Sequence, residues 1–186
     1  MSGAENMAYD RATLDAVENG GVLATFRLFS FASPTVSYGR LQTLNHVHAQ
    51  VPAAWPAVQR PTGGGIVFHD NDLCLSLVWR HGQSPLPRSP REQYRWIHGF
   101  VLSALRTGHD VRMAACADMK PAAAPFETRE CFTQPVGYDL LIGTAKVVGG
   151  ALYRRREATL YQGSIQGSFG ADLPARLQNA FRSLLS

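Results

Sequence analysis

A cysteine and a lysine in the second half of the chain could form a reactive pair. Cys131 lies among polar residues just before a run of predicted strands, and Lys146 lies within that run. A free cysteine with a pKa of ~8.5 is only about 3% thiolate at pH 7, and a nearby cation raises this nucleophilic fraction. Lys146 would be that cation if the fold brings the two together. A semi-buried cysteine and an exposed strand lysine are the alternatives without chemistry.

Three consecutive glycines, Gly63, Gly64 and Gly65, stand between Arg60 and His69. Glycine loses the most chain entropy on ordering and adds no packing, so a glycine run in apolar sequence indicates close approach of the backbone to a ligand. Its N–H groups could bind charged or carbonyl oxygens. A flexible turn is the alternative, because the run matches neither the dinucleotide fingerprint nor the phosphate loop.

The remaining reactive side chains give weaker signals. His69 and Asp70 could be a base with its orienting carboxylate, or a plain loop pair, because neighbours on one strand point apart. Cys74 is expected to pack in the core on a strand, and Cys116 to lie in a loop. Three cysteines without a C-x-x-C pair predict at least one free thiol, no disulfide framework and no metal site. Residues 154–156, three arginines, are expected to be a solvated turn.

The segments that must position these residues show clear periodicity. Helices are predicted over residues 6–21, with Asn6 as N-cap, over 89–108 and over 172–185. Residues 43–60 are expected to hold a short helix or a loop, and 116–125 an exposed loop. Strands are predicted over residues 22–31, 35–38, 73–79, 138–142, 146–153 and 159–165, the last three as an antiparallel meander.

The totals of the chain predict one globular domain. Its 186 residues are 45% hydrophobic and 17% charged, with no apolar run of the ~20 residues that a membrane span needs. The N-terminus lacks the features of a secretory signal, so a cytoplasmic location is predicted. A net charge of +4 favours acidic partners. The sequence has no recognisable nucleic-acid-binding motif, so nucleic acid is not an expected partner. Of the 18 basic residues only Lys120 and Lys146 are lysines, which draws attention to Lys146.

Four motifs occur in a recognisable order along the chain, at residues 6–10, 37–42, 60–70 and 143–149, the last followed by 162–164. In this order they resemble the lipoate-protein ligase and octanoyltransferase family, within the biotin/lipoate ligase superfamily. The resemblance implies an α/β fold with a mixed, largely antiparallel sheet flanked by helices. It also implies a single catalytic domain over residues 1–186, C-terminally short for the family, in which the glycine-rich and lysine strands line a tunnel for an acyl chain.

The residues from Cys131 to Leu140 are similar to the cysteine-dependent octanoyltransferases. That resemblance implies transfer of an octanoyl or lipoyl group from acyl carrier protein, through a Cys131 thioester, to a lysine of a lipoyl domain or a glycine-cleavage H-type protein, with no cofactor. It gives catalytic roles to Cys131 and Lys146, with Lys146 and glycine N–H groups stabilising the thiolate and the developing oxyanion. The substrate-binding residues it implies are Ser37, Gly39, Arg60, Thr62, Gly63, Gly64, Gly65, His69 and Gly149.

Two other activities remain open from the sequence. An ATP-dependent lipoate ligase would use ATP and magnesium to form an acyl-adenylate, although such ligases more often carry Asn-Asp where this chain has Tyr138-Asp139. A non-catalytic acyl-binding or carrier-binding module would keep the pocket without the reaction. A biotin ligase is disfavoured, because residues 60–65 do not reproduce its nucleotide loop.

Overall fold

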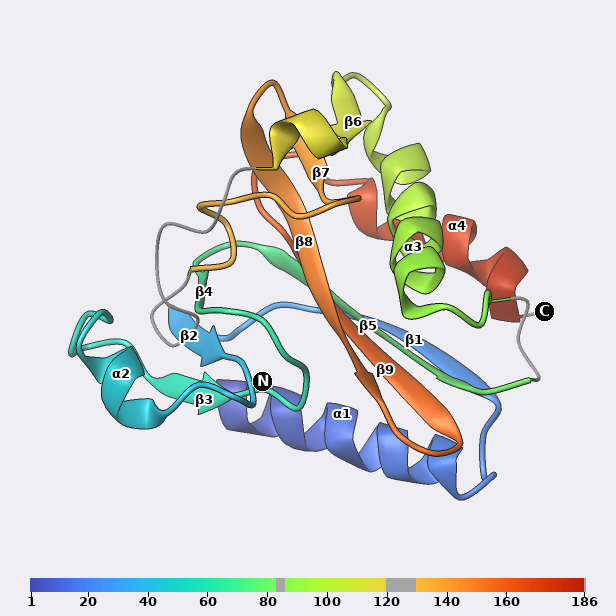
Figure 1. Cartoon of the computed structure of the whole chain (residues 1–186), viewed down its shortest axis with the longest axis horizontal. Helices are drawn as coiled ribbons and strands as arrows, with labels where there is room; N and C mark the ends of the chain where they lie inside the picture. Colours follow the sequence, from blue (N-terminus) through green and yellow to red (C-terminus); the bar gives the residue numbers. More distant parts are fainter. Residues whose placement is uncertain (83–85, 120–129, 186) are drawn as a thin grey trace.

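A six-stranded antiparallel sheet forms the centre of the computed structural model, which describes residues 1–82, 86–119 and 130–185 (Figure 1). Its strand order is β1-β5-β9-β8-β7-β6. The strands are β1 (Ala24–Phe29), β5 (Leu73–Arg80), β6 (Val111–Met113), β7 (Leu140–Ile142), β8 (Ala145–Arg154) and β9 (Ala158–Ile165). Neighbouring strands β7, β8 and β9 pair antiparallel, which confirms the predicted meander.

A smaller sheet of three strands lies beside the large one and carries the glycine-rich turn. It contains β2 (Thr35–Tyr38), β3 (Ala57–Gln59) and β4 (Val67–His69), in the order β3-β2-β4. Strand β2 pairs parallel with β3 and antiparallel with β4. The short helix α2 (Leu44–His48) precedes β3, so residues 43–60 hold one of the two expected elements, a short helix, together with a strand that was not predicted.

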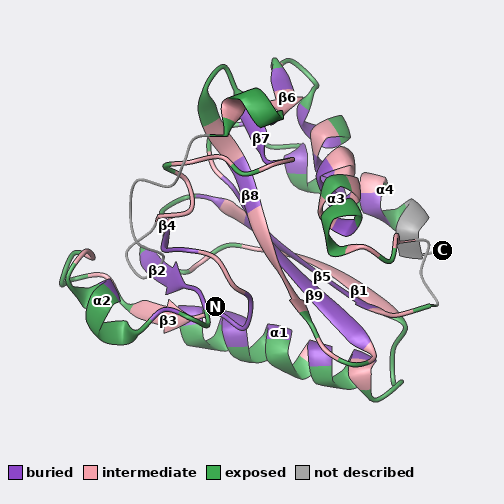
Figure 2. Cartoon of the chain, viewed as in Figure 1, coloured by how far each residue is buried: buried purple, intermediate pink, exposed green. Residues whose placement is uncertain are grey.

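Helices cover both faces of the large sheet. Helix α1 (Gly3–Glu18) packs Leu14 and Val17 against Val78 and Leu160 on one face. Helices α3 (Pro90–Leu105) and α4 (Leu173–Leu185) pack on the other face, where they share the main core with alternate residues of β5 and β9. Strand β5 is therefore buried on both sides, as its nearly continuous apolar sequence requires (Figure 2). No helix in the described part of the chain is long and apolar enough to cross a membrane.

The prediction of Asn6 as the N-cap of the first helix is wrong. Ser2 is the N-cap: its hydroxyl accepts a hydrogen bond from the Glu5 backbone at 3.3 Å, and the Glu5 carboxylate accepts one from the Ser2 backbone at 2.7 Å. This capping box satisfies two of the free N–H groups at the helix start. Asn6 is instead buried inside the helix, where its side chain contacts Arg27 of β1.

Other element boundaries differ by a few residues. The strand expected over residues 22–31 is the shorter β1, and the strand expected over 138–142 starts at Leu140, because Tyr138 adopts a left-handed φ of 74° that no strand residue can have. Residues 116–118 form a 3₁₀ turn, η1 (Cys116–Asp118), and residues 120–125 of the expected loop lie outside the described residues. Ser89 caps α3 as predicted.

Candidate active site

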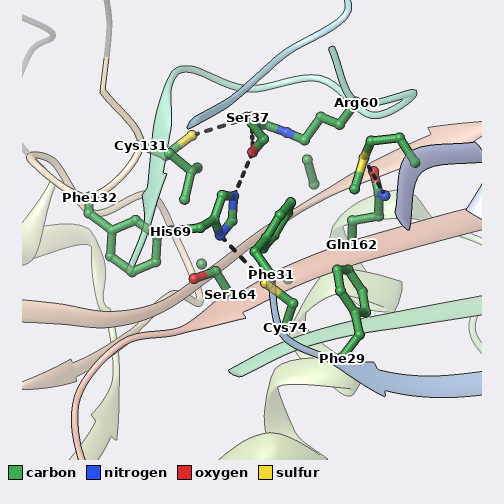
Figure 3. Close-up of a pocket in the computed structure, with 16 residues that line it drawn as sticks. Phe29, Phe31, Ser37, Arg60, His69, Cys74, Cys131, Phe132, Gln162 and Ser164 are labelled. Atoms are coloured by element: carbon green, nitrogen blue, oxygen red, sulfur yellow. Dashed lines mark hydrogen bonds between the residues drawn. The ribbon is translucent and has the colours of Figure 1, made fainter. Parts of the chain in front are cut away.

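A largely apolar cavity lies where the small sheet meets β8 and β9 of the large sheet (Figure 3). Its apolar walls are formed by Met7, Phe29, Phe31 and Val67. The backbone of the glycines in β8 and β9 forms a further wall. Polar groups converge at one end, where Cys131 sits in the loop before β7. Such a cavity, apolar with a few convergent polar groups, suits a ligand with a hydrocarbon chain and one reactive polar end.

The Cys131 thiol is held by the glycine-rich turn. Its Sγ accepts a hydrogen bond from the Gly65 N–H at 3.0 Å, and the Cys131 N–H donates to the Ile66 carbonyl at 2.8 Å. Gly64 has φ of 91°, and a Cβ there would lie 3.1 Å from the sulfur and 2.9 Å from Arg60. The turn therefore needs glycine at position 64 for its left-handed conformation, which places the Gly65 N–H against the thiol.

Arg60 is the cation that contacts the thiol. Its Nη2 lies 3.8 Å from the sulfur, and the guanidinium is fixed by hydrogen bonds to the carbonyls of Gly63 and Gly65 and, through Nη1, to the Ser37 hydroxyl at 3.0 Å. Burial lowers the pKa of Arg60, and the adjacent Cys131 raises it. Because an arginine remains protonated in proteins, a fixed positive charge stands beside the Cys131 thiol.

The fold brings Lys146 next to Cys131, where its ammonium contacts the backbone carbonyl and not the sulfur. Its Nζ lies 2.8 Å from Asp139 Oδ2 and donates to the Cys131 carbonyl at 2.7 Å. A Cβ on Gly149 would lie 2.3 Å from Lys146 Cε, so this glycine, which lines the cavity, also makes room for the lysine side chain. Lys146 thus fixes the backbone at Cys131, and its charge is balanced by the buried Asp139 carboxylate.

Asp139 is in turn held by a buried network between α3 and the sheet. It accepts a hydrogen bond from Tyr94 at 2.5 Å, and the Tyr94 hydroxyl accepts one from the Gly150 N–H at 3.0 Å. His98 of α3 donates through Nδ1 to the Tyr138 carbonyl and accepts from the Tyr161 hydroxyl at Nε2, both at 2.7 Å. Burial lowers the pKa of His98 to about 4, so its imidazole is neutral near pH 7.

The partner of His69 is Asp72, so of the two alternatives that the sequence left open for His69 and Asp70, the base with its orienting carboxylate does not hold. His69 Nδ1 lies 2.7 Å from Asp72 Oδ2. Its Nε2 lies 2.7 Å from the Ser37 hydroxyl (Figure 3). Asp70 is exposed, because Asn71 takes a left-handed φ of 66° and turns the chain so that Asp72 points inward. Burial alone would raise the pKa of Asp72, but its hydrogen bonds with His69 and two neighbours outweigh burial and lower it.

The other predicted binding residues support the site from outside the cavity. Gly39 allows two backbone segments to meet, because a Cβ there would lie 2.1 Å from the Gly64 carbonyl oxygen. The Thr62 hydroxyl donates to the Gln162 side chain of β9 at 2.8 Å, which ties the glycine-rich turn to the large sheet. A Cβ on Gly63 would meet nothing within 4 Å, and its carbonyl is what binds Arg60.

Four residues at the site were not predicted to have a role there. Asp72, Cys74, Gln162 and Ser164 all lie in or against the cavity, and all are buried. Cys74 was expected only to pack in the core, yet its thiol donates to Asp72 at 3.2 Å. The alternation of β5 and β9 is the signal that points to them, because their polar side chains share the face opposite the main core.

Among the described His, Cys, Asp and Glu side chains, one group has ligating atoms close enough together to hold a metal ion. It consists of His69, Asp72 and Cys74, whose ligating atoms lie within 4.8 Å of one another. Each of them is already satisfied by hydrogen bonds within the cluster. Burial, followed by the nearby Asp72 charge, raises the pKa of Cys74 well above its usual value, so it stays a protonated thiol. All three cysteines of the chain are free, as the absence of a disulfide framework predicted.

The fold is shared with solved lipoate protein ligase structures. Ta0514 from T. acidophilum, solved with bound lipoic acid, matches with a TM-score of 0.72 and 20% identity, over 97% of this chain and 79% of that one. A lipoate-protein ligase A bound with ATP matches with a TM-score of 0.68 and 19% identity, over 96% and 79% of the two chains. The predicted fold class, a mixed α/β domain with a large antiparallel sheet flanked by helices, is confirmed.

Sequence similarity defines the family. The chain belongs to the lipoyl protein ligase A/B catalytic domain family, whose model matches residues 2–184. It is 34% identical to octanoyltransferase LipM of Kyrpidia tusciae, over 88% of this chain and 62% of that protein. It is 35% identical to octanoyltransferase LipM of Symbiobacterium thermophilum, over 88% and 61%. The chain thus spans about three-fifths of the length of these curated relatives.

Proposed function

We propose that this chain transfers an octanoyl group in lipoate assembly through a thioester on Cys131. The observation that carries the proposal is the position of the Cys131 thiol, at the polar end of an apolar cavity, 3.0 Å from the Gly65 N–H and 3.8 Å from the Arg60 guanidinium. The similarity to proteins named octanoyltransferase LipM supports the same chemistry.

The geometry suits both halves of a transfer through cysteine. In the first, the Cys131 sulfur attacks the carbonyl carbon of an acyl thioester, a C–S bond forms, and the donor leaves as its thiol. In the second, a lysine amine attacks the Cys131 thioester, a C–N bond forms, and Cys131 leaves with the electrons of its C–S bond. A backbone N–H and a fixed cation beside the sulfur stabilise the thiolate in both halves. The acyl group passes from the donor thioester to the Cys131 thioester and then to an amide of the acceptor lysine. These steps are downhill in free energy without ATP, so this function needs no cofactor.

The proposed donor is an acyl carrier protein and the proposed acceptor a lipoyl domain or glycine-cleavage H-type protein. A solved structure of similar fold is that of a bi-partite lipoate protein ligase and its E2 lipoyl domain, from an archaeal lipoylation system of Thermoplasma acidophilum. The apolar cavity would hold the hydrocarbon tail of the acyl group. The net charge of +4 favours association with an acidic donor protein.

Intact-protein mass spectrometry after mixing with octanoyl-acyl carrier protein tests the proposal. We expect one octanoyl adduct in the wild type and in Cys116→Ser, which removes an exposed cysteine, and none in Cys131→Ser. An unmodified wild type, or an adduct that persists in Cys131→Ser, would overturn the thioester. If free octanoate, ATP and magnesium give an octanoylated acceptor in equal amount with the wild type and with Cys131→Ser, the chain catalyses the ligase reaction instead.

A further inference from the structure

His69 is the side chain through which this site can accept a proton. Of the described residues that line the cavity, the titratable ones are Arg60, His69, Cys74 and Cys131. Arg60 does not give up its proton, and the buried Cys74 is a neutral thiol that already donates to Asp72. Cys131 is the group that is acylated. A neutral imidazole is therefore the remaining base.

The hydrogen bonds around His69 fix where its lone pair points. A carboxylate can only accept, so the proton of the imidazole must be on Nδ1, which lies 2.7 Å from Asp72 Oδ2. The lone pair is then on Nε2, 2.7 Å from the Ser37 oxygen. Because that oxygen accepts a hydrogen bond from Arg60 Nη1 at 3.0 Å, the Ser37 hydroxyl is free to donate its own proton to His69.

The chain of contacts from His69 ends beside the nucleophile. A single planar guanidinium, that of Arg60, contacts the Ser37 oxygen through Nη1 and the Cys131 sulfur through Nη2 (Figure 3). Ser37 and Cys131 thus lie on two neighbouring nitrogens of the same rigid group. An acyl carbonyl bonded to the Cys131 sulfur would therefore lie next to the Ser37 hydroxyl. An amine that attacks this carbonyl would approach the same hydroxyl.

Two other groups near the site are poorly suited to act as the base. Lys146 is engaged as a donor to the Cys131 carbonyl and paired with Asp139, so its ammonium has no lone pair to offer. His98 is fully buried, does not line the cavity, and uses both ring nitrogens in hydrogen bonds.

The two halves of the proposed transfer differ in their need for a base. When Cys131 is acylated by a thioester, one thiol replaces another and no net proton acceptor is needed. When an amine attacks the thioester, its nitrogen becomes positively charged as the C–N bond forms, and it must lose a proton before the C–S bond breaks to give a stable amide. A base beside the thioester therefore matters most in the second half.

We propose that Ser37 and His69 form a base relay that deprotonates the lysine amine as it attacks the Cys131 thioester, with Asp72 positioning His69. This inference rests on the proposed function. The amine gives a proton to the Ser37 oxygen while the Ser37 proton passes to His69 Nε2. The C–S bond then breaks, its electron pair leaves with the Cys131 sulfur, and the proton on His69 returns to that thiolate through Ser37 or solvent. No oxidant, metal or further reactant is required.

Separate measurement of the two halves tests the relay. Octanoyl-Cys131 protein is prepared with excess octanoyl-acyl carrier protein, freed of donor, and mixed with an apo lipoyl domain, while mass spectrometry follows loss of the adduct. General-base catalysis is worth about 10²- to 10⁴-fold, so we expect Ser37→Ala and His69→Asn to slow this decay at least ~100-fold. The rate of adduct formation should stay within the same order of magnitude. Ser37→Thr, which keeps a hydroxyl, should recover part of the decay rate.

The pH profile distinguishes a base from a residue that only supports the fold. The decay rate of the wild type should rise with pH and then level off, and His69→Asn should lose that inflection. His48→Asn, in an exposed histidine of α2, is the matched control and should keep the wild-type profile.

Each outcome of this experiment decides the relay or the transfer itself. No adduct in the wild type would overturn the proposed function. If Ser37→Ala and His69→Asn form the adduct, lose it at the wild-type rate and keep the inflection in the pH profile, the relay is overturned and the proposed function stays intact. Equal slowing of formation and decay, with the inflection retained, would show a structural role and also overturn it. If His69→Asn does not fold, Ser37→Ala and Ser37→Thr carry the same comparison.

Discussion

His98 makes the stability of this protein depend on pH in a defined window. The imidazole is fully buried between the Tyr138 carbonyl and the Tyr161 hydroxyl, and burial lowers its pKa from 6.5 to about 4. As pH falls below 6.5 the unfolded chain binds a proton at this histidine and the folded chain does not. Folding stability therefore decreases from pH 6.5 to about 4, and each pKa unit is worth about 1.4 kcal/mol, which gives a total loss of about 3 kcal/mol.

Chemical denaturation at a series of pH values measures this loss. The free energy of unfolding of the wild type, from urea titrations between pH 7 and pH 4, is compared with that of His98→Gln, which can still donate to a carbonyl but does not titrate. Other groups contribute to both profiles, so the difference between the two isolates His98. We expect the variant to be less stable at pH 7 and to approach the wild type as pH falls. His48→Gln, on exposed α2, is the control that should keep the wild-type slope.

Parallel profiles of wild type and His98→Gln from pH 6.5 to 4 would refute this reasoning. They would show that the protonated imidazole is tolerated in the folded state, and hence that the network around Asp139 and Lys146 is open to water. A wild type that becomes more stable as pH falls would also contradict it, because the sign of the linkage follows directly from a lowered histidine pKa.

Further substitutions test how the site is supported, each by urea denaturation. Gly39→Ala should destabilise the protein by about 1–3 kcal/mol or more, because the added Cβ would lie 2.1 Å from the Gly64 carbonyl oxygen. Gly99→Ala, in α3 with no atom within 4 Å of the added Cβ, should instead stabilise it by about 0.5–1 kcal/mol. Lys146→Met should cost about 3–5 kcal/mol by leaving the buried Asp139 charge unpaired, and adding Asp139→Asn should recover part of that loss.

Much of the fold followed from local patterns in the sequence. The Ser89 N-cap, the apolar face of α3 and the run of strands from β7 to β9 each depend on residues close together in the chain, so their physical cause is visible in sequence. The errors have local causes as well. At the first helix two residues compete as N-cap, and Ser2 prevails over Asn6 because Glu5 completes a capping box with it. The strand predicted over residues 138–142 begins two residues later, at Leu140, because the residue type of Tyr138 does not indicate its left-handed φ.

The site shows the limit of the same reasoning. Residue types and their order along the chain were enough to identify Cys131, Arg60, His69 and the glycine run, and to predict the family. They did not determine which charges pair. Lys146 was matched to the Cys131 thiol because both are reactive, yet the fold directs its ammonium to Asp139 and places Arg60 at the sulfur.

What the sequence determined by itself is the set of reactive groups and the elements that carry them, because both depend on neighbours within a few residues. What only the tertiary structure decided is which of those groups touch. Ser37, His69 and Asp72 come from β2, β4 and the turn after β4, and Cys131 comes from a loop some sixty residues further on. Hydrogen bonds act over about 3 Å, so the chemistry of this site depends on how two sheets pack, which spacing along the chain cannot reveal.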